Sequence, residues 1–63
     1  MNLTPSQQKA IDALIAAGET EAAHEASRAF ADGKTYNASK RRLPTRIKKF
    51  ISDANFWTAQ GRK

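Results

Sequence analysis

The stretch LTPSQQKAIDALIAAG, residues 3–18, has the start, the periodicity and the end of an amphipathic helix. Thr4 is a typical N-cap residue, Pro5 suits the first helical position, and Gln7 three residues after the cap completes a capping box. At about 100° per residue, one side of the helix gathers the residues Gln7, Ile11, Leu14 and Ile15. The stretch therefore predicts a helix over residues 5–17.

A second helix is expected over residues 20–32, between Gly18 and Gly33. Glycine readily takes the left-handed conformation that ends helices, so each glycine can terminate the helix before it. One side of the second helix is apolar and consists of Ala22, Ala23, Ala26, Ala29 and Phe30. Because alanine buries little area, Phe30 must supply much of the apolar contact of this helix.

The next segment, residues 33–43, fits either a loop or a short helix, and we favour a short helix over residues 36–42. Leu43 precedes Pro44 and is therefore biased away from the helical conformation, which predicts a break. A helix over residues 44–52 follows. Its apolar side is formed by Leu43, Ile47, Phe50 and Ile51.

A last short helix is expected over residues 54–60, capped by Ser52 or Asp53. Its aromatic residues Phe56 and Trp57 would close the core from the C-terminal side. A chain of 63 residues can build one domain with a small core. The expected fold is therefore all-α, a small three- to four-helix bundle over residues 1–63.

Charge is divided unevenly between the two halves of the chain. Residues 1–32 contain two basic and five acidic residues, a formal charge of −3, whereas residues 33–63 contain nine basic residues and one acidic residue, a charge of +8. A solvated surface without a charged ligand would mix the two signs. The second half therefore creates a positive field that attracts polyanions, and nucleic acid is the polyanion that we expect.

The candidate nucleic-acid-binding residues surround the start of the third helix. They are Lys40, Arg41, Arg42, Thr45, Arg46, Lys48 and Lys49. On a helical projection, the four from Thr45 onward lie opposite the apolar side. Cations grouped in this way neutralise several phosphates and release their counterions. Tyr36, in the segment beside them, is the one aromatic residue that we expect to contact the ligand, because the others are needed for the core.

Catalytic and metal-binding functions lack the residues that their chemistry requires. The only histidine, His24, has no second histidine four residues away, as zinc-binding helices have, and we expect it on the surface. The serines have no histidine and acid partners for a catalytic triad, and the three glycines are too far apart for a phosphate-binding loop. We therefore expect a protein that is not an enzyme and needs no cofactor.

The sequence shows no sign of membrane attachment or export. Residues 1–8 have neither the basic start nor the apolar run of a secretory signal. No stretch approaches the length of about 20 apolar residues that spans a bilayer. The chain also has no cysteine, as is typical of proteins that do not depend on disulfides. A cytoplasmic protein without membrane contact is expected.

Three stretches together resemble a known family. They are LTPSQQKAIDALI, residues 3–15, TEAA, residues 20–23, and LPTRIKKFISDANFWTA, residues 43–59. Their order is similar to that of the homeodomain-like helix-turn-helix module at the start of phage terminase small subunits and related small phage DNA-binding proteins. The resemblance implies an accessory protein of phage or mobile-element type that binds double-stranded DNA, with Thr45, Arg46, Lys48 and Lys49 on the recognition helix.

Other partners fit the same basic surface. RNA presents the same phosphates as DNA. An acidic host protein could also dock there, in which case the chain would be a small phage-encoded interaction module that binds and inhibits this host protein. A solvated helix face is the simplest alternative. The small core also favours a homodimer, which would bury further apolar area.

Overall fold

The computed structural model describes residues 3–61, and the side chain of Lys40 lies outside this description. The elements are α1 (Pro5–Ala16), α2 (Thr20–Ala31), the short 3-10 helix η1 (Ala38–Lys40) and α3 (Thr45–Ala59). Residues 3–61 contain no strand. The predicted all-α class is therefore confirmed.

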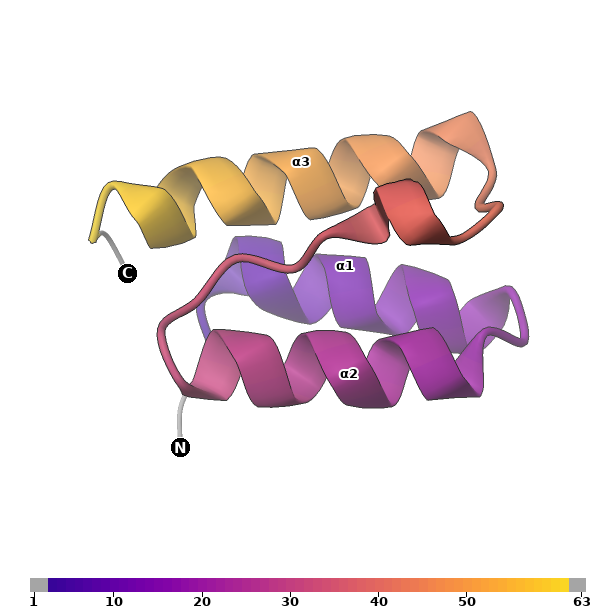
Figure 1. Ribbon diagram of the computed structural model, residues 1–63, viewed down its shortest axis with the longest axis horizontal. Helices are drawn as coiled ribbons and strands as arrows, with labels where there is room; N and C mark the ends of the chain where they lie inside the picture. The colour runs from indigo at the N-terminus through magenta and orange to yellow at the C-terminus, as the bar shows by residue number, and fades with distance from the viewer. Residues whose placement is uncertain (1–2, 62–63) are drawn as a thin grey trace.

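Helix α1 is the central element of the fold, because it packs against both α2 and α3. Figure 1 shows that α1 and α2 run in opposite directions and that α3 also runs opposite to α1. Residues 32–44 return along the molecule from the end of α2 to the start of α3 (Figure 1). The result is a bundle with extents of 27 × 19 × 18 Å.

The predicted capping box at the start of α1 is confirmed. The Thr4 hydroxyl accepts a hydrogen bond from the backbone N–H of Gln7 at 3.2 Å, and the Gln7 side chain accepts one from the backbone N–H of Thr4 at 2.9 Å. The amide of Gln7 also donates to the hydroxyl of Thr58 at 2.7 Å. The cap therefore joins the start of α1 to the end of α3 while it satisfies a buried polar side chain.

The prediction that Gly18 and Gly33 terminate the two helices before them is also confirmed. Gly18 and Gly33 have positive φ angles of 80° and 75°. The N–H of Glu19 donates to the carbonyl of Leu14 at 2.9 Å, and the N–H of Lys34 donates to that of Ala29 at 2.8 Å. These are the long hydrogen bonds of Schellman motifs, which require a left-handed residue after the helix. A substitution at either glycine would therefore strain the backbone.

The core lies between α1 and the two helices on either side of it. Leu14 on α1 and Ile51 on α3 are its largest fully buried side chains. Five of the twelve buried apolar residues are alanines, so the helices approach closely but bury little area each. The buried apolar residues are Ala10, Ile11, Leu14, Ala22, Ala23, Ala26, Phe30, Tyr36, Leu43, Ile47, Ile51 and Ala54.

Two predicted helices in the C-terminal half are in fact one. The break expected around Ser52 and Asp53 is wrong, because α3 continues without interruption from Thr45 to Ala59. Ala54 follows Ile47 and Ile51 at helical spacing and is completely buried. Burial of this stripe is the physical reason for one long helix, and it leaves Ser52 and Asp53 as exposed mid-helix residues.

The aromatic residues of the last turns also lie elsewhere than expected. Phe56 is 54% exposed and Trp57 is 38% exposed, so the prediction that they close the core is wrong. On a continuous helix, Phe56 points well away from the buried stripe of α3. Ile15, predicted on the apolar side of α1, is likewise 53% exposed.

The segment between α2 and α3 contains less helix than predicted. Instead of a helix over residues 36–42, only Ala38–Lys40 forms a helical turn, which Asn37 caps through its side chain. Helix-turn-helix modules join their helices by about three or four residues and cross them at about 90–120°. Here residues 32–44 intervene, and α2 and α3 lie along the same general direction in Figure 1. The helix-turn-helix type therefore remains a prediction that this connection does not support.

Candidate nucleic-acid interface

The outward face of α3 contains the cations that the sequence placed there. Ile47 and Ile51 are buried, whereas the predicted contacts on this helix are exposed, namely Thr45, Arg46, Lys48 and Lys49. The expected phase of the helix is therefore confirmed. Because the buried stripe fixes the rotation of α3, the outward direction of these side chains is a property of the fold.

Arg46 and Lys49 lie together around one surface hollow. Phe50, Ser52, Asp53 and Phe56 complete its lining. All six residues come from α3, so the hollow lies along the outer surface of a single rigid helix. Two cations and two aromatic rings thus share a surface with one carboxylate, which gives the hollow a net positive charge.

Lys48 lies on another side of α3. It borders a separate hollow between the helix and the preceding segment, together with residues that include Thr35, Ser39 and Asn55. On a helix, Lys48 and Arg46 are about 160° apart at 100° per residue. The predicted cations therefore form two groups rather than one patch, and only Arg46 and Lys49 share a hollow.

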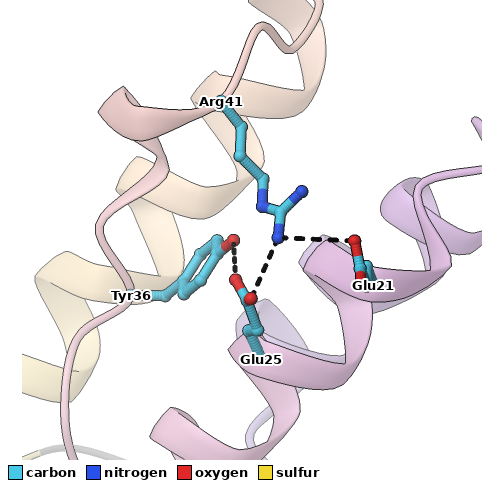
Figure 2. A network of polar contacts seen from close by, with 4 residues as sticks. All are labelled: Glu21, Glu25, Tyr36 and Arg41. Carbon is cyan, nitrogen blue, oxygen red and sulfur yellow. Dashed lines mark hydrogen bonds and ion pairs between the residues drawn. The ribbon is translucent and has the colours of Figure 1, made fainter.

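In the cluster of three basic residues before α3, Lys40, Arg41 and Arg42, the two side chains that the structure describes differ in how freely they can bind a ligand. Arg42 is exposed, and the side chain of Lys40 lies outside the described residues. Arg41 instead binds α2, where its guanidinium donates to the Glu25 carboxylate at 2.9 Å and lies 3.9 Å from that of Glu21 (Figure 2). These carboxylates offset the charge of Arg41, so it is a weaker candidate for phosphate than its neighbours.

No ion pair within the described part of the chain holds the remaining cations of the cluster and of α3, namely Arg42, Arg46, Lys48 and Lys49. Within residues 3–61, no carboxylate at ion-pair distance offsets their charges. Exposed cations of this kind can neutralise phosphates and release the counterions of a nucleic acid. Together with the exposed Thr45, this set is the part of the predicted site that is available among the side chains that the structure describes.

Tyr36, predicted as a ligand contact, is part of the core. Its side chain is 8% exposed, and its hydroxyl donates to the Glu25 carboxylate at 3.1 Å (Figure 2). Asn55 on α3 accepts from the Tyr36 N–H at 2.8 Å and donates to the Tyr36 carbonyl at 2.7 Å. Tyr36 therefore joins α2, α3 and the segment between them, and its ring is not placed to stack on a base.

This arrangement changes the acidity of Tyr36. Burial raises the pKa of Tyr36 above its ordinary value of 10.0, and the hydrogen bond to Glu25 raises it further, whereas Arg41 opposes the rise. The folded protein holds the neutral phenol more tightly than the unfolded chain does. The stabilisation that comes from the neutral phenol of Tyr36 is fully present below pH 10. It is lost as the pH rises through the pKa of Tyr36 in the folded protein.

We expect the free energy of unfolding to decrease above pH 10 more steeply in the wild type than in Tyr36→Phe. The phenylalanine retains the buried ring but has no proton to lose. Urea titrations of both proteins at a series of alkaline pH values measure the difference. Parallel curves for the two proteins would show that the Tyr36 proton is not linked to folding.

The sequence interpretation missed Phe56 and Trp57 as surface residues. Their rings form an edge-to-face pair with centroids 5.1 Å apart and planes at 81°. Phe56 also lines the hollow of Arg46 and Lys49. A projection that continued the helix beyond Asp53 would have placed Phe56 near Lys49, so the pattern did contain this information.

His24 is exposed on α2, as expected. Among the residues that the structure describes, no group of three or more histidine, cysteine or acidic side chains is arranged to hold a metal ion. Nor does any helix in residues 3–61 combine the length and the apolar character needed to cross a membrane.

Comparison with protein-family models, with curated proteins and with solved structures gives no match for this chain. The resemblance to the terminase module therefore remains a prediction, and the functional argument depends on the residues of the site.

Proposed function

We propose that this protein binds nucleic acid by holding its phosphates on the cationic face of α3. The observation behind the proposal is the pair Arg46 and Lys49, which share one hollow and are not ion-paired within residues 3–61. Lys48, which borders a separate hollow, and Arg42, which precedes the helix, add further exposed charge. Double-stranded DNA, the ligand expected from the sequence, is the first to be tested.

The fold supports this proposal by making the cations a rigid surface. Helix α3 has 15 residues and is therefore about 22 Å long. Its rotation is fixed by the buried side chains of Ile47 and Ile51. Cations on a fixed helix can meet successive phosphates without the loss of backbone entropy that a flexible tail would undergo. The acidic residues Glu21 and Glu25 lie on α2, so they leave the hollow of α3 positive.

Salt dependence tests the proposal. Each neutralised phosphate contributes about −0.9 to the slope of log affinity against log salt. If two to four of the available cations contact phosphates, affinity for a short DNA duplex should fall by about 10- to 150-fold between about 50 and 200 mM salt. Fluorescence anisotropy with a labelled duplex measures this change. If neither the duplex nor a single strand binds at the lower salt concentration, or if affinity does not vary with salt, the proposal is refuted.

A protein-interaction module is the second candidate, and the exposed apolar residues Ile15, Phe56 and Trp57 favour it. Large apolar side chains on a surface are typical of protein contacts. The two candidates differ in their response to nuclease. A host protein that remains bound after nuclease treatment, and is released by substitution of Phe56, would favour the second candidate.

A further inference from the structure

The exposed aromatic pair of α3 continues the cationic surface toward the end of the helix. Phe56 lines the same hollow as Arg46 and Lys49, and Trp57 packs edge-to-face against Phe56. The hollow is open to solvent along the outer surface of α3, so an extended ligand can reach all of its lining residues. Charge and aromatic surface are therefore available to one ligand at the same time.

The chemistry of this hollow fits a nucleotide whose base is unpaired. Aromatic rings stack on the faces of bases, and nearby cations hold the backbone that joins them. Asp53 lies in the same lining and repels phosphate, but its carboxylate can accept hydrogen bonds from the N–H groups of a base edge. The hydroxyl of Ser52 can donate or accept. Bases in a duplex are stacked and paired, so only an unpaired base can present its face to Phe56.

We propose that α3 binds single-stranded nucleic acid, with phosphates on Arg46 and Lys49 and an unpaired base against Phe56. This inference rests on the proposed function and specifies its ligand. It also gives a role to the aromatic pair, which the core does not need.

The charges of the hollow favour this ligand over a second copy of the chain. A symmetric contact through the same face would bring the Arg46 and Lys49 side chains of both copies together, with one Asp53 from each copy to offset them. A polyanion instead neutralises both cations and leaves the aromatic rings for its bases. The occupant that complements the whole lining is therefore a nucleic-acid strand.

The test compares Phe56→Ala with the matched variant Ile15→Ala. Phe56 and Ile15 are 54% and 53% exposed, so each variant removes an apolar side chain of similar exposure. Ile15 is on α1 and lines a different hollow. Affinity is measured for a short single-stranded oligonucleotide, for the same strand with abasic sites in place of its bases, and for a duplex of equal length.

We expect Phe56→Ala to weaken binding of the single strand by about 5- to 150-fold, the range for loss of one base–aromatic stack. Ile15→Ala should leave the affinity unchanged. The abasic strand should bind the wild type more weakly than the intact strand and should not respond to Phe56→Ala. Trp57, the only tryptophan, should change its fluorescence when the intact strand binds.

Three results would overturn the inference in different ways. Salt-sensitive binding that is equal for the intact strand, the abasic strand and both variants would leave the proposed function in place and remove the role of Phe56. Failure of every oligonucleotide to bind would refute the proposed function and the inference together. A wild-type dimer that Phe56→Ala dissociates, with strand affinity unchanged, would assign the aromatic pair to a second copy and also overturn the inference.

Discussion

Replacement of Ile51 by alanine is expected to remove most of the stability of this protein. Ile51 is 1% exposed and is one of the two largest fully buried side chains. Truncation of a buried isoleucine to alanine destabilises a protein by about 2–5 kcal/mol, because apolar contact is lost and a cavity remains. A domain of this size is expected to have a total stability of only about 3–9 kcal/mol.

The alanine-rich core makes the loss harder to compensate. Five of its twelve buried apolar residues are alanines, so few longer side chains could move into the space left by Ile51. Urea denaturation followed by circular dichroism measures the effect, with Ile15→Ala as the control. Ile15 is 53% exposed, so its truncation should change the free energy of unfolding by less than about 1 kcal/mol. Equal losses in the two variants would contradict the described core.

Local patterns were sufficient to predict the first two helices. The Thr4 and Gln7 capping box and the left-handed Gly18 and Gly33 act within a few residues of the chain, so the sequence alone specifies them. The outward face of α3 was predicted for the same reason. Its apolar residues recur at helical spacing, and this spacing places the cations on the opposite side.

The positions of Tyr36 and Arg41 depended on partners that are distant in sequence. Tyr36 pairs with Glu25 and with Asn55, and Arg41 pairs with Glu25. None of these contacts follows a periodic pattern, so both residues were expected to be available to a ligand. The fold instead uses them to attach residues 32–44 to α2 and α3.

The end of α3 was predicted incorrectly because a local preference was given too much importance. Ser52 and Asp53 favour helix starts, which suggested a new helix at Ala54. Burial of Ala54 beside Ile51 favours continuation of the existing helix. In this competition tertiary packing determines the outcome, since a capping preference contributes only about 1 kcal/mol. The exposure of Phe56 follows directly from this continuation.

Removal of both cations of the α3 hollow, Arg46→Ala with Lys49→Ala, is expected to give the largest loss of nucleic-acid binding. Two fewer phosphate contacts should reduce the magnitude of the salt slope by about 1.8 for a DNA duplex and by about 1.4 for a single strand. If the two lost contacts contribute little to affinity near 200 mM salt, the double variant should bind roughly tenfold or more weakly than the wild type at about 50 mM salt. Both side chains are exposed, so circular dichroism and thermal unfolding should be unchanged.

A second double variant, with the same net charge as the first, distinguishes a local binding site from a general electrostatic effect. Lys9→Ala with Lys34→Ala also removes two exposed cations, but from α1 and from the segment after α2. If the hollow of α3 binds the phosphates, this variant should retain nearly the wild-type salt slope. If both double variants reduce affinity and slope equally, the net charge of +5 rather than the face of α3 attracts the ligand. The comparison therefore tests whether the rotation of α3, fixed by Ile47 and Ile51, determines where nucleic acid binds.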